Sequence, residues 1–442
     1  MTTITSRRPS AESSSTGRRH HGEADRRRRA PRLSGVLPEF GSARHHGVGF
    51  WAVALAFLTL AAFTTVPSPL YGLYQARDGF SEFMLTVIYA AYAAGVVGAL
   101  AFAGHLSDWL GRKRLLIPAA ALTVVSAGAF LVWNSVAGLL MARVLTGVSI
   151  GLTQSTATAY LSELHARHRP EASGARAQVT ATTVNMGGLG VGALIAGGLA
   201  QWVGDPLTIS YLVFLVLSCV ALIAVALSPE TRERLTPRPR YRPQRVSLPV
   251  EARGEFYAAS LSAFIVFAAM GLFAGLAGLF LVVALHHPSH ALAGATLFAV
   301  FGSAVIAQLA TMSWPLRRLL AAGMAAMVVG LAAIVIAVWQ SNPSLALFIV
   351  GGAITGAGGG AVFKGAVATV IRISPAETRA EALAGTYLAA FVGLSVPIVG
   401  AGVALAEGVS PRVTLLAFAI AVALGIVGSA IKLLGGPPEE HR

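Results

Sequence analysis

The sequence GHLSDWLGRKRLL, from Gly104 to Leu116, is a short polar break between two long stretches of apolar residues. A membrane core about 30 Å thick is crossed by about 20 residues of α-helix, and both stretches have about this length. Arg112, Lys113 and Arg114 lie together in the break, and basic residues in short loops stay on the cytoplasmic side of a membrane. The stretch therefore predicts two transmembrane helices joined by a cytoplasmic loop.

The rest of the sequence repeats this pattern. Apolar residues make up 55% of the 442 residues and charged residues 12%, whereas soluble domains carry roughly 25% charged residues. The stretches are apolar on every face, which favours membrane helices over the alternating strands of a β-barrel. We predict an all-α membrane protein with twelve transmembrane helices at 48–73, 83–105, 115–133, 137–161, 177–202, 206–228, 256–285, 291–313, 316–339, 344–370, 380–405 and 411–434.

Lys and Arg residues are distributed unevenly among the polar breaks. They concentrate in the N-terminal tail and in the breaks after the second, fourth, sixth, eighth and tenth predicted helices. The other breaks contain only Arg77 and Arg412. This alternation predicts that both termini are cytoplasmic. Membrane topology and anionic lipid headgroups account for the formal charge of +14, so we expect no nucleic-acid partner.

The topology divides the chain into five segments. Residues 1–46 are rich in Arg and Ser with almost no apolar residues, which predicts a disordered cytoplasmic tail. A six-helix half at 47–228 and a second at 256–434 are separated by residues 229–255, whose spaced prolines and arginines favour an extended cytoplasmic linker. Residues 435–442 form a short C-terminal tail.

The two halves resemble each other in sequence. Residues 169–198 are similar to 374–402 at an offset of 205, and a second similarity has an offset of 209. The matched pairs are Pro170 and Pro375, Gly188 and Gly393, Gly197 and Gly402, Gly147 and Gly356, and Gly151 and Gly360. Parallel repeats of this kind are typical of transporters, in which the substrate binds between the halves near the middle of the membrane.

The break at 104–116 also resembles the signature loop of the major facilitator superfamily, G-x-L-x-D-x-x-G-R-K-x-x-L. Every fixed position matches, by Gly104, Leu106, Asp108, Gly111, Arg112, Lys113 and Leu116. The resemblance covers residues 48–434. It implies a monomeric transporter of the plasma membrane that works by alternating access, rather than an enzyme, and we expect neither a cofactor nor a metal.

In this family the signature loop braces the two halves in the outward-open state, which implies gating roles for Asp108 and Arg112. The alternative is a loop that only fixes topology. That alternative explains the basic residues, but it explains neither the glycines nor Asp108.

Two basic residues lie inside predicted helices. Arg143 stands with Gly147 and Gly151 in RVLTGVSIG, which resembles a second motif of the family. An intramembrane cation costs roughly 2.5–3.5 kcal/mol on insertion scales, so it usually faces protein or water and has a function. For Arg143 the alternative is that it reaches the outer membrane interface. Lys364 has two interpretations: it binds a substrate or a carboxylate partner, or its side chain reaches back to the cytoplasmic interface.

The fifth helix carries Gly188, Gly192 and Gly197, which partly resemble the G-x-x-x-G-P-x-x-G-G pattern of exporters in the family, with Ala193 in place of proline. Close helix packing is the alternative interpretation.

Polar and aromatic residues in several spans are candidates to line a substrate cavity: Thr64, Tyr71, Tyr89, Tyr92, Gln154, Thr158, Asn185, Phe267, Met270, Tyr387 and Phe391. Such a lining suits amphiphilic or aromatic molecules.

These features favour a secondary active transporter that exports drug-like or secondary-metabolite compounds. The alternative is uptake of a sugar or an organic anion, with Arg143 and Lys364 as anion partners. A proton antiporter would normally need an acid or a histidine within the membrane, and none lies at mid-depth in this sequence. Protons are therefore a candidate coupling ion without an assigned residue.

Overall fold

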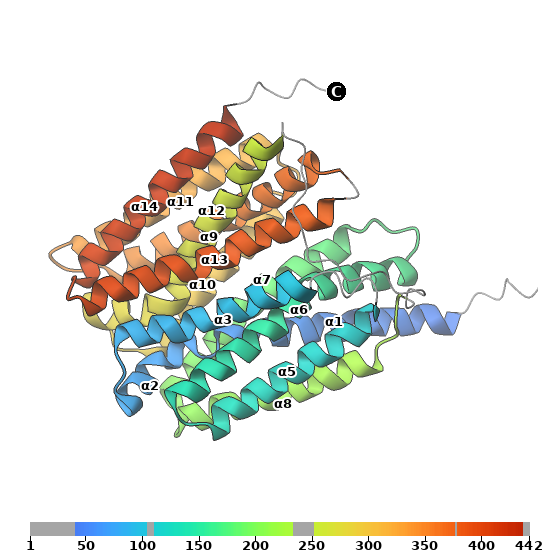
Figure 1. Ribbon diagram of the computed structural model, residues 1–442, viewed down its shortest axis with the longest axis horizontal. Helices are drawn as coiled ribbons and strands as arrows, with labels where there is room; N and C mark the ends of the chain where they lie inside the picture. Colours follow the sequence, from blue (N-terminus) through green and yellow to red (C-terminus); the bar gives the residue numbers. More distant parts are fainter. Residues whose placement is uncertain (1–39, 104–109, 233–251, 376–377, 436–442) are drawn as a thin grey trace, which may run out of the picture. The chain divides into compact units, whose positions relative to one another are not determined.

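The computed structural model describes residues 40–103, 110–232, 252–375 and 378–435 (Figure 1). Over these residues all regular elements are helical, and twelve helices are long and apolar enough to cross a membrane. The predicted all-α fold is therefore confirmed. The first helix begins at Phe40, so residues 40–46 of the expected tail are helical. The rest of that tail, residues 233–251 of the linker and residues 436–442 lie outside the described residues.

The N-terminal half contains α1 (Phe40–Thr65), the 3-10 turn η1 (Ser68–Leu70), α2 (Tyr71–Asp78), α3 (Glu82–Ala103), α5 (Arg112–Val132), α6 (Val136–His168), α7 (Ala175–Trp202) and α8 (Pro206–Leu227). The sequence predicts one continuous helix over 48–73. This prediction is wrong, because α1 ends at Thr65 and η1 and α2 follow it. Pro67 and Pro69 follow α1, and proline has no N–H group with which to continue the helical hydrogen bonds. The helix α6 runs beyond its predicted end at 161 because polar residues can stay helical outside the lipid.

The C-terminal half contains α9 (Arg253–Leu279), which runs into the π-helical turn η3 (Phe280–Ala284), then α10 (His290–Ala310), α11 (Leu316–Trp339), α12 (Leu345–Ile373), α13 (Arg379–Ala406) and α14 (Pro411–Leu434). Among the described residues, five helices begin after a serine whose hydroxyl accepts an N–H of the first turn: Ser81, Ser135, Ser289, Ser344 and Ser410. These caps satisfy N–H groups that a helix start leaves unpaired.

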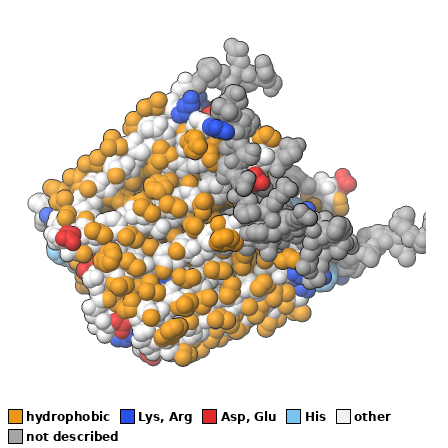
Figure 2. All heavy atoms as spheres, viewed as in Figure 1, with side chains coloured by type: hydrophobic (Ala, Val, Ile, Leu, Met, Phe, Trp, Pro, Cys, Tyr) orange, Lys and Arg blue, Asp and Glu red, His pale blue; other side chains and the backbone are white. Residues whose placement is uncertain are grey.

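The helices form a bundle with two ends. We call the end that carries residues 169–174, 228–232, 311–315 and 374–375 the linker end, and the opposite end the distal end. Between them the flank is covered by hydrophobic side chains, and charged side chains gather toward the ends (Figure 2). Apolar residues such as Val216, Ile306 and Leu424 are more than half exposed there. Lipid is the solvent in which such a surface is stable.

The sequence repeat is also a repeat of helix contacts. An added Cβ at Gly147 on α6 would meet the backbone of Tyr92 on α3, and one at Gly356 on α12 would meet the backbone of Val300 on α10. In the same way Gly188 on α7 lies against α1, and Gly393 on α13 lies against α9. The two six-helix halves therefore use the same glycine contacts to bring helices together.

The two halves meet at the distal end. There α7 packs on α10, where Gly197 lies against Gly294, and α3 packs on α13, where Thr86 lies against Gly402. The side-chain oxygen of Gln201 accepts the backbone N–H of His290 and the hydroxyl of Ser289, both at 3.0 Å. In this structure the two halves are thus in contact at the distal end.

Candidate functional site

A cavity lies between the halves and is lined by eight helices. It holds about 750 Å³ of space free of protein atoms, open solvent included. We call it the central cavity. Its lining is Thr64, Thr65, Tyr89, Tyr92, Arg143, Ile150, Gln154, Asn185, Met186, Leu189, Val266, Phe267, Met270, Ala274, Phe301, Ala304, Gln308, Gly359, Gly360, Phe363, Phe391 and Leu394. Apolar and aromatic groups dominate, with a few polar groups among them, as in most small-molecule sites.

The charged group of this cavity is the guanidinium of Arg143, whose side chain is 1% exposed. Its Nη1 donates a hydrogen bond of 2.7 Å to the backbone oxygen of Thr64. The rings of Tyr92 and Tyr89 lie 4.8 and 5.4 Å from its central carbon, within the range of cation–π attraction. Arg143 is therefore held in the protein interior, and the alternative that it reaches the membrane interface is wrong.

The acceptor for Arg143 exists because of the break after α1. The last four carbonyl groups of a helix have no partner within that helix, and Thr64 is the next to last residue of α1. The negative end of the helix dipole also favours a cation there. The Nε atom of Arg143 remains buried and without a hydrogen-bond acceptor. In the part of the chain that the structure describes, Arg143 forms no ion pair.

Most of the predicted cavity residues lie together. Thr64, Tyr89, Tyr92, Gln154, Asn185, Phe267, Met270 and Phe391 all line the central cavity. Three do not line it. Tyr71 is buried at the start of α2, and Thr158 is exposed on α6. Tyr387 packs on the Phe363 ring, with the ring centroids 5.8 Å apart. Sequence reasoning missed Gln308, although a single amide in the apolar stretch SAVIAQLATM was a usable signal.

A second cavity opens at the linker end between α7, α10 and α12. We call it the linker-end cavity, and its lining is Gln178, Val179, Thr182, Gln308, Leu309, Met312 and Lys364. Gln308 lines both cavities. The ammonium group of Lys364 donates a 2.8 Å hydrogen bond to the backbone oxygen of Gln308. The predicted intramembrane cation thus lines the linker-end cavity, beside a residue that this cavity shares with the central cavity.

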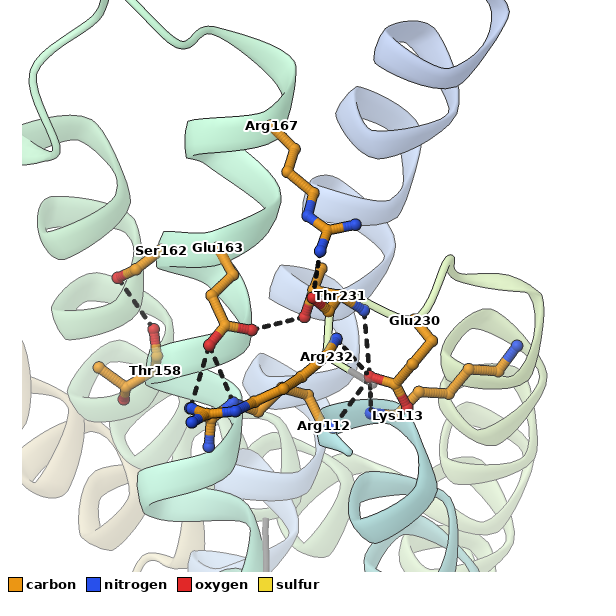
Figure 3. A network of polar contacts seen from close by, with 9 residues as sticks. All are labelled: Arg112, Lys113, Thr158, Ser162, Glu163, Arg167, Glu230, Thr231 and Arg232. Carbon is orange, nitrogen blue, oxygen red and sulfur yellow. Dashed lines mark hydrogen bonds and ion pairs between the residues drawn. The ribbon is translucent and has the colours of Figure 1, made fainter. Parts of the chain in front are cut away.

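The described part of the signature loop belongs to an ionic network at the linker end (Figure 3). Gly104, Leu106 and Asp108 lie outside the described residues. The guanidinium of Arg112 donates hydrogen bonds of 3.0 and 3.1 Å to Glu163 on α6, and Thr231 donates one of 2.6 Å to the same carboxylate. Arg167 donates to the backbone oxygen of Thr231. The network joins α5, α6 and the segment after α8.

Glu230 explains one glycine of the signature. Its Oε1 accepts the backbone N–H of Arg112 at 2.9 Å and that of Lys113 at 3.4 Å, so it caps the start of α5 from a distant part of the sequence. A Cβ at Gly111 would lie 2.6 Å from the other oxygen of Glu230, and the φ angle of Gly111 is 105°. Only glycine tolerates both the conformation and the contact.

The glycines of the fifth membrane helix, α7, make packing contacts. Gly188 and Gly192 face the backbone of α1, and Gly197 faces His290 and Gly294 of α10. They therefore do what the packing interpretation predicts, and their role in the direction of transport stays a prediction. The described residues contain no cluster of His, Cys, Asp and Glu that could hold a metal ion.

Comparisons with known proteins agree with this architecture. The family model of the Major Facilitator Superfamily matches residues 53–343. A stretch of 131 residues, 28% of this chain and 28% of the relative, is 30% identical to an arabinose-proton symporter of Bacillus subtilis (strain 168). A stretch of 61 residues, 14% of this chain and 11% of the relative, is 39% identical to myo-inositol transporter 2 of Schizosaccharomyces pombe (strain 972 / ATCC 24843).

Among solved structures, that of the nucleoside transporter NupG is similar to the chain. The match has a TM-score of 0.68 and 10% sequence identity, and it covers 87% of this chain and all of the other. At this identity the likeness shows the fold alone. The chain spans less than a third of the length of either curated relative, so their substrates are not carried over with the match.

Proposed function

The chain belongs to the major facilitator superfamily, and we propose that this membrane transporter takes up a small organic anion whose charged group binds Arg143 in the central cavity. The protein is a transporter rather than an enzyme. Its helices place a closed contact between the halves at the distal end and a cavity at the linker end. Alternating access would require a second arrangement in which this contact opens.

The observation that carries the proposal is the uncompensated charge of Arg143. A buried cation is expensive unless a partner of opposite charge accompanies it. Arg143 has a backbone oxygen and two aromatic rings, but among the described residues no carboxylate. A guanidinium with an unused N–H in a cavity is suited to a carboxylate or a similar planar anion. The same charge repels cationic compounds, which weakens the case for general drug export.

A neutral sugar is the second candidate. The names of the two curated relatives, an arabinose-proton symporter and a myo-inositol transporter, favour it. The amides of Gln154, Asn185 and Gln308 and the hydroxyl of Thr65 supply donors and acceptors for hydroxyl groups. These comparisons support uptake of a small polar molecule more than efflux of drug-like compounds.

We propose in addition an orientation in the membrane and a coupling ion. The basic residues of the linker end favour a plasma-membrane protein with that end in the cytoplasm. Proton symport is supported by the name of one relative. Since the lining of the central cavity contains no acid, a proton that accompanies the anion would be carried by a group outside this cavity.

The test uses four compounds that separate charge from chemical class. Benzenesulfonate and benzenesulfonamide are an aromatic anion and its neutral match, and gluconate and glucose are a polyhydroxy anion and its neutral match. The thermal unfolding of the purified full-length protein is measured with each compound. We expect at least one anion to raise the melting temperature at concentrations where its neutral match does not.

The second measurement follows labelled gluconate into proteoliposomes under a pH gradient. Faster uptake when the outside is acidic supports proton symport. Stabilisation by glucose equal to that by gluconate would replace the anion proposal by the sugar. Stabilisation by ethidium, a cationic dye, with none by either anion would restore drug export as the better interpretation.

A further inference from the structure

The linker-end cavity contains a cation that the proposed site at Arg143 does not use. Lys364 is half-buried on α12 and faces a space lined by the amides of Gln178 and Gln308 and the hydroxyl of Thr182. One of its three N–H groups donates to the backbone oxygen of Gln308. Among the described residues Lys364 forms no ion pair. Donors therefore remain for a second anionic partner.

The two cations lie at different depths in the bundle. At the repeat offset of 209 the position equivalent to Arg143 is Gly352, and Lys364 follows it on α12 by twelve residues. At a rise of 1.5 Å per residue this separates the two levels by about 18 Å along the helices. Gln308, which lines both cavities, lies between them. The two cavities are thus neighbours, with Arg143 in one and Lys364 in the other.

An anion that leaves Arg143 for the linker end crosses a mainly apolar lining that includes Phe267, Phe301 and Phe363. Moving an ion into apolar surroundings without compensation is costly, so a second cation on the path lowers the barrier. We propose that Lys364, with Gln178, Thr182 and Gln308, forms a second and weaker anion site through which the substrate passes between Arg143 and the linker-end solution. This inference rests on the proposed uptake of an organic anion.

The site is weaker because of its surroundings. An ammonium group that is partly exposed keeps part of its hydration, and salt screens its charge over about 8–10 Å. At a separation of about 18 Å, Lys364 therefore has little effect on the affinity of Arg143 for the anion. Its effect is on the rate at which the anion enters and leaves, since a local cation raises the concentration of anions at an entrance.

The experiment measures exchange and binding separately in the full-length protein. Proteoliposomes are loaded with unlabelled benzenesulfonate, and the exchange of labelled benzenesulfonate is followed for the wild type, Lys364→Gln and Lys364→Arg. Lys432→Gln, which removes an exposed cation from the same end on α14, is the matched control. Binding is measured from the rise of the melting temperature with benzenesulfonate.

We expect Lys364→Gln to slow exchange about 5- to 10-fold and to reduce its dependence on ionic strength, with the dissociation constant changed less than about twofold. Lys364→Arg should restore exchange, and Lys432→Gln should resemble the wild type. Exchange at the wild-type rate in Lys364→Gln would overturn the second site while leaving the proposed function intact. A wild type that neither gluconate nor benzenesulfonate stabilises would overturn the proposed function and this inference with it.

A purely structural role for Lys364 has its own signature. The bond to Gln308 lies in the last turn of α10, where a cation stabilises the helix end. If this were its whole function, Lys364→Gln would lower the melting temperature without anion, and the ionic-strength dependence of exchange would be that of the wild type. That result would also overturn the proposal.

Discussion

The helices α6 and α12 occupy equivalent places in the two halves, but they carry their charges at different depths. Both use glycines to approach a neighbouring helix. In each, a threonine hydroxyl, of Thr146 or Thr355, donates a hydrogen bond of 2.8 Å to the carbonyl oxygen four residues earlier. At the same offset, Lys364 is equivalent to Ser155, while the position equivalent to Arg143 is a glycine. The scaffold is therefore duplicated, whereas the cations are not.

This difference separates two kinds of constraint on the sequence. The glycine contacts are required in each half, because each half needs its helices close together to build a cavity wall. Under the proposed function a cation is required only where the anion binds, so repeating it would add a desolvation cost with no partner. The charges are therefore placed asymmetrically, with Arg143 nearer the distal end and Lys364 nearer the linker end.

The largest effect that would test this asymmetry is expected at Arg143. Arg143→Gln removes a charged donor worth about 1.5–3 kcal/mol to a hydrogen-bonded anion, which weakens binding about 10- to 100-fold. The measurement is the concentration of gluconate or benzenesulfonate that half-saturates the rise in melting temperature. Arg143→Lys, which keeps the charge without the planar fork, should fall between the wild type and Arg143→Gln. Wild-type affinity in Arg143→Gln would remove the functional meaning of the asymmetry.

The second prediction concerns the duplicated scaffold. Gly147→Ala and Gly356→Ala each place a methyl group against backbone on the neighbouring helix, and overpacking of this kind costs about 1–3 kcal/mol. We expect similar falls in the melting temperature for both variants.

Two glycines with open space around them serve as controls for this pair. Gly98→Ala on α3 and Gly302→Ala on α10 add a methyl group that meets no atom within 4 Å. They should be neutral or stabilising by about 0.5–1 kcal/mol. A fall confined to one member of the pair Gly147 and Gly356 would show that the halves are not mechanically equivalent.

The sequence was sufficient for the fold because hydropathy, basic loops and glycine spacing act locally. The sequence predicts twelve spans, and the main errors are the helix ends and the missed break near Pro67. Helix ends are hard to predict because polar residues outside the lipid can stay helical. The cavity was only partly predictable. Arg143 could point to lipid headgroups or inward, and the sequence does not show that the carbonyl of Thr64 would be free to receive it.

Glu163 and Glu230 were harder to anticipate for a related reason. Both contact Arg112 across more than fifty residues of sequence, and each looks like an ordinary polar residue at the end of a span. Their partners are set by the way α5, α6 and the end of α8 meet. Such long-range pairing cannot be derived from local pattern, although the nearby excess of arginines indicates that carboxylates at this end will find partners.

The smallest predicted effect compares the ion pairs of the two halves. In the N-terminal half Arg112 is 7% and Glu163 29% exposed, whereas in the C-terminal half Arg372 is 49% and Glu255 40% exposed. Glu163→Gln leaves a buried guanidinium facing a neutral amide, so we expect a loss of about 1–3 kcal/mol. Glu255→Gln removes a solvent-exposed pair worth about 0.2–1 kcal/mol, which salt screens further. Melting temperatures at low and high salt measure both losses, and equal losses at high salt would show that the Arg112 network adds no stability specific to the N-terminal half.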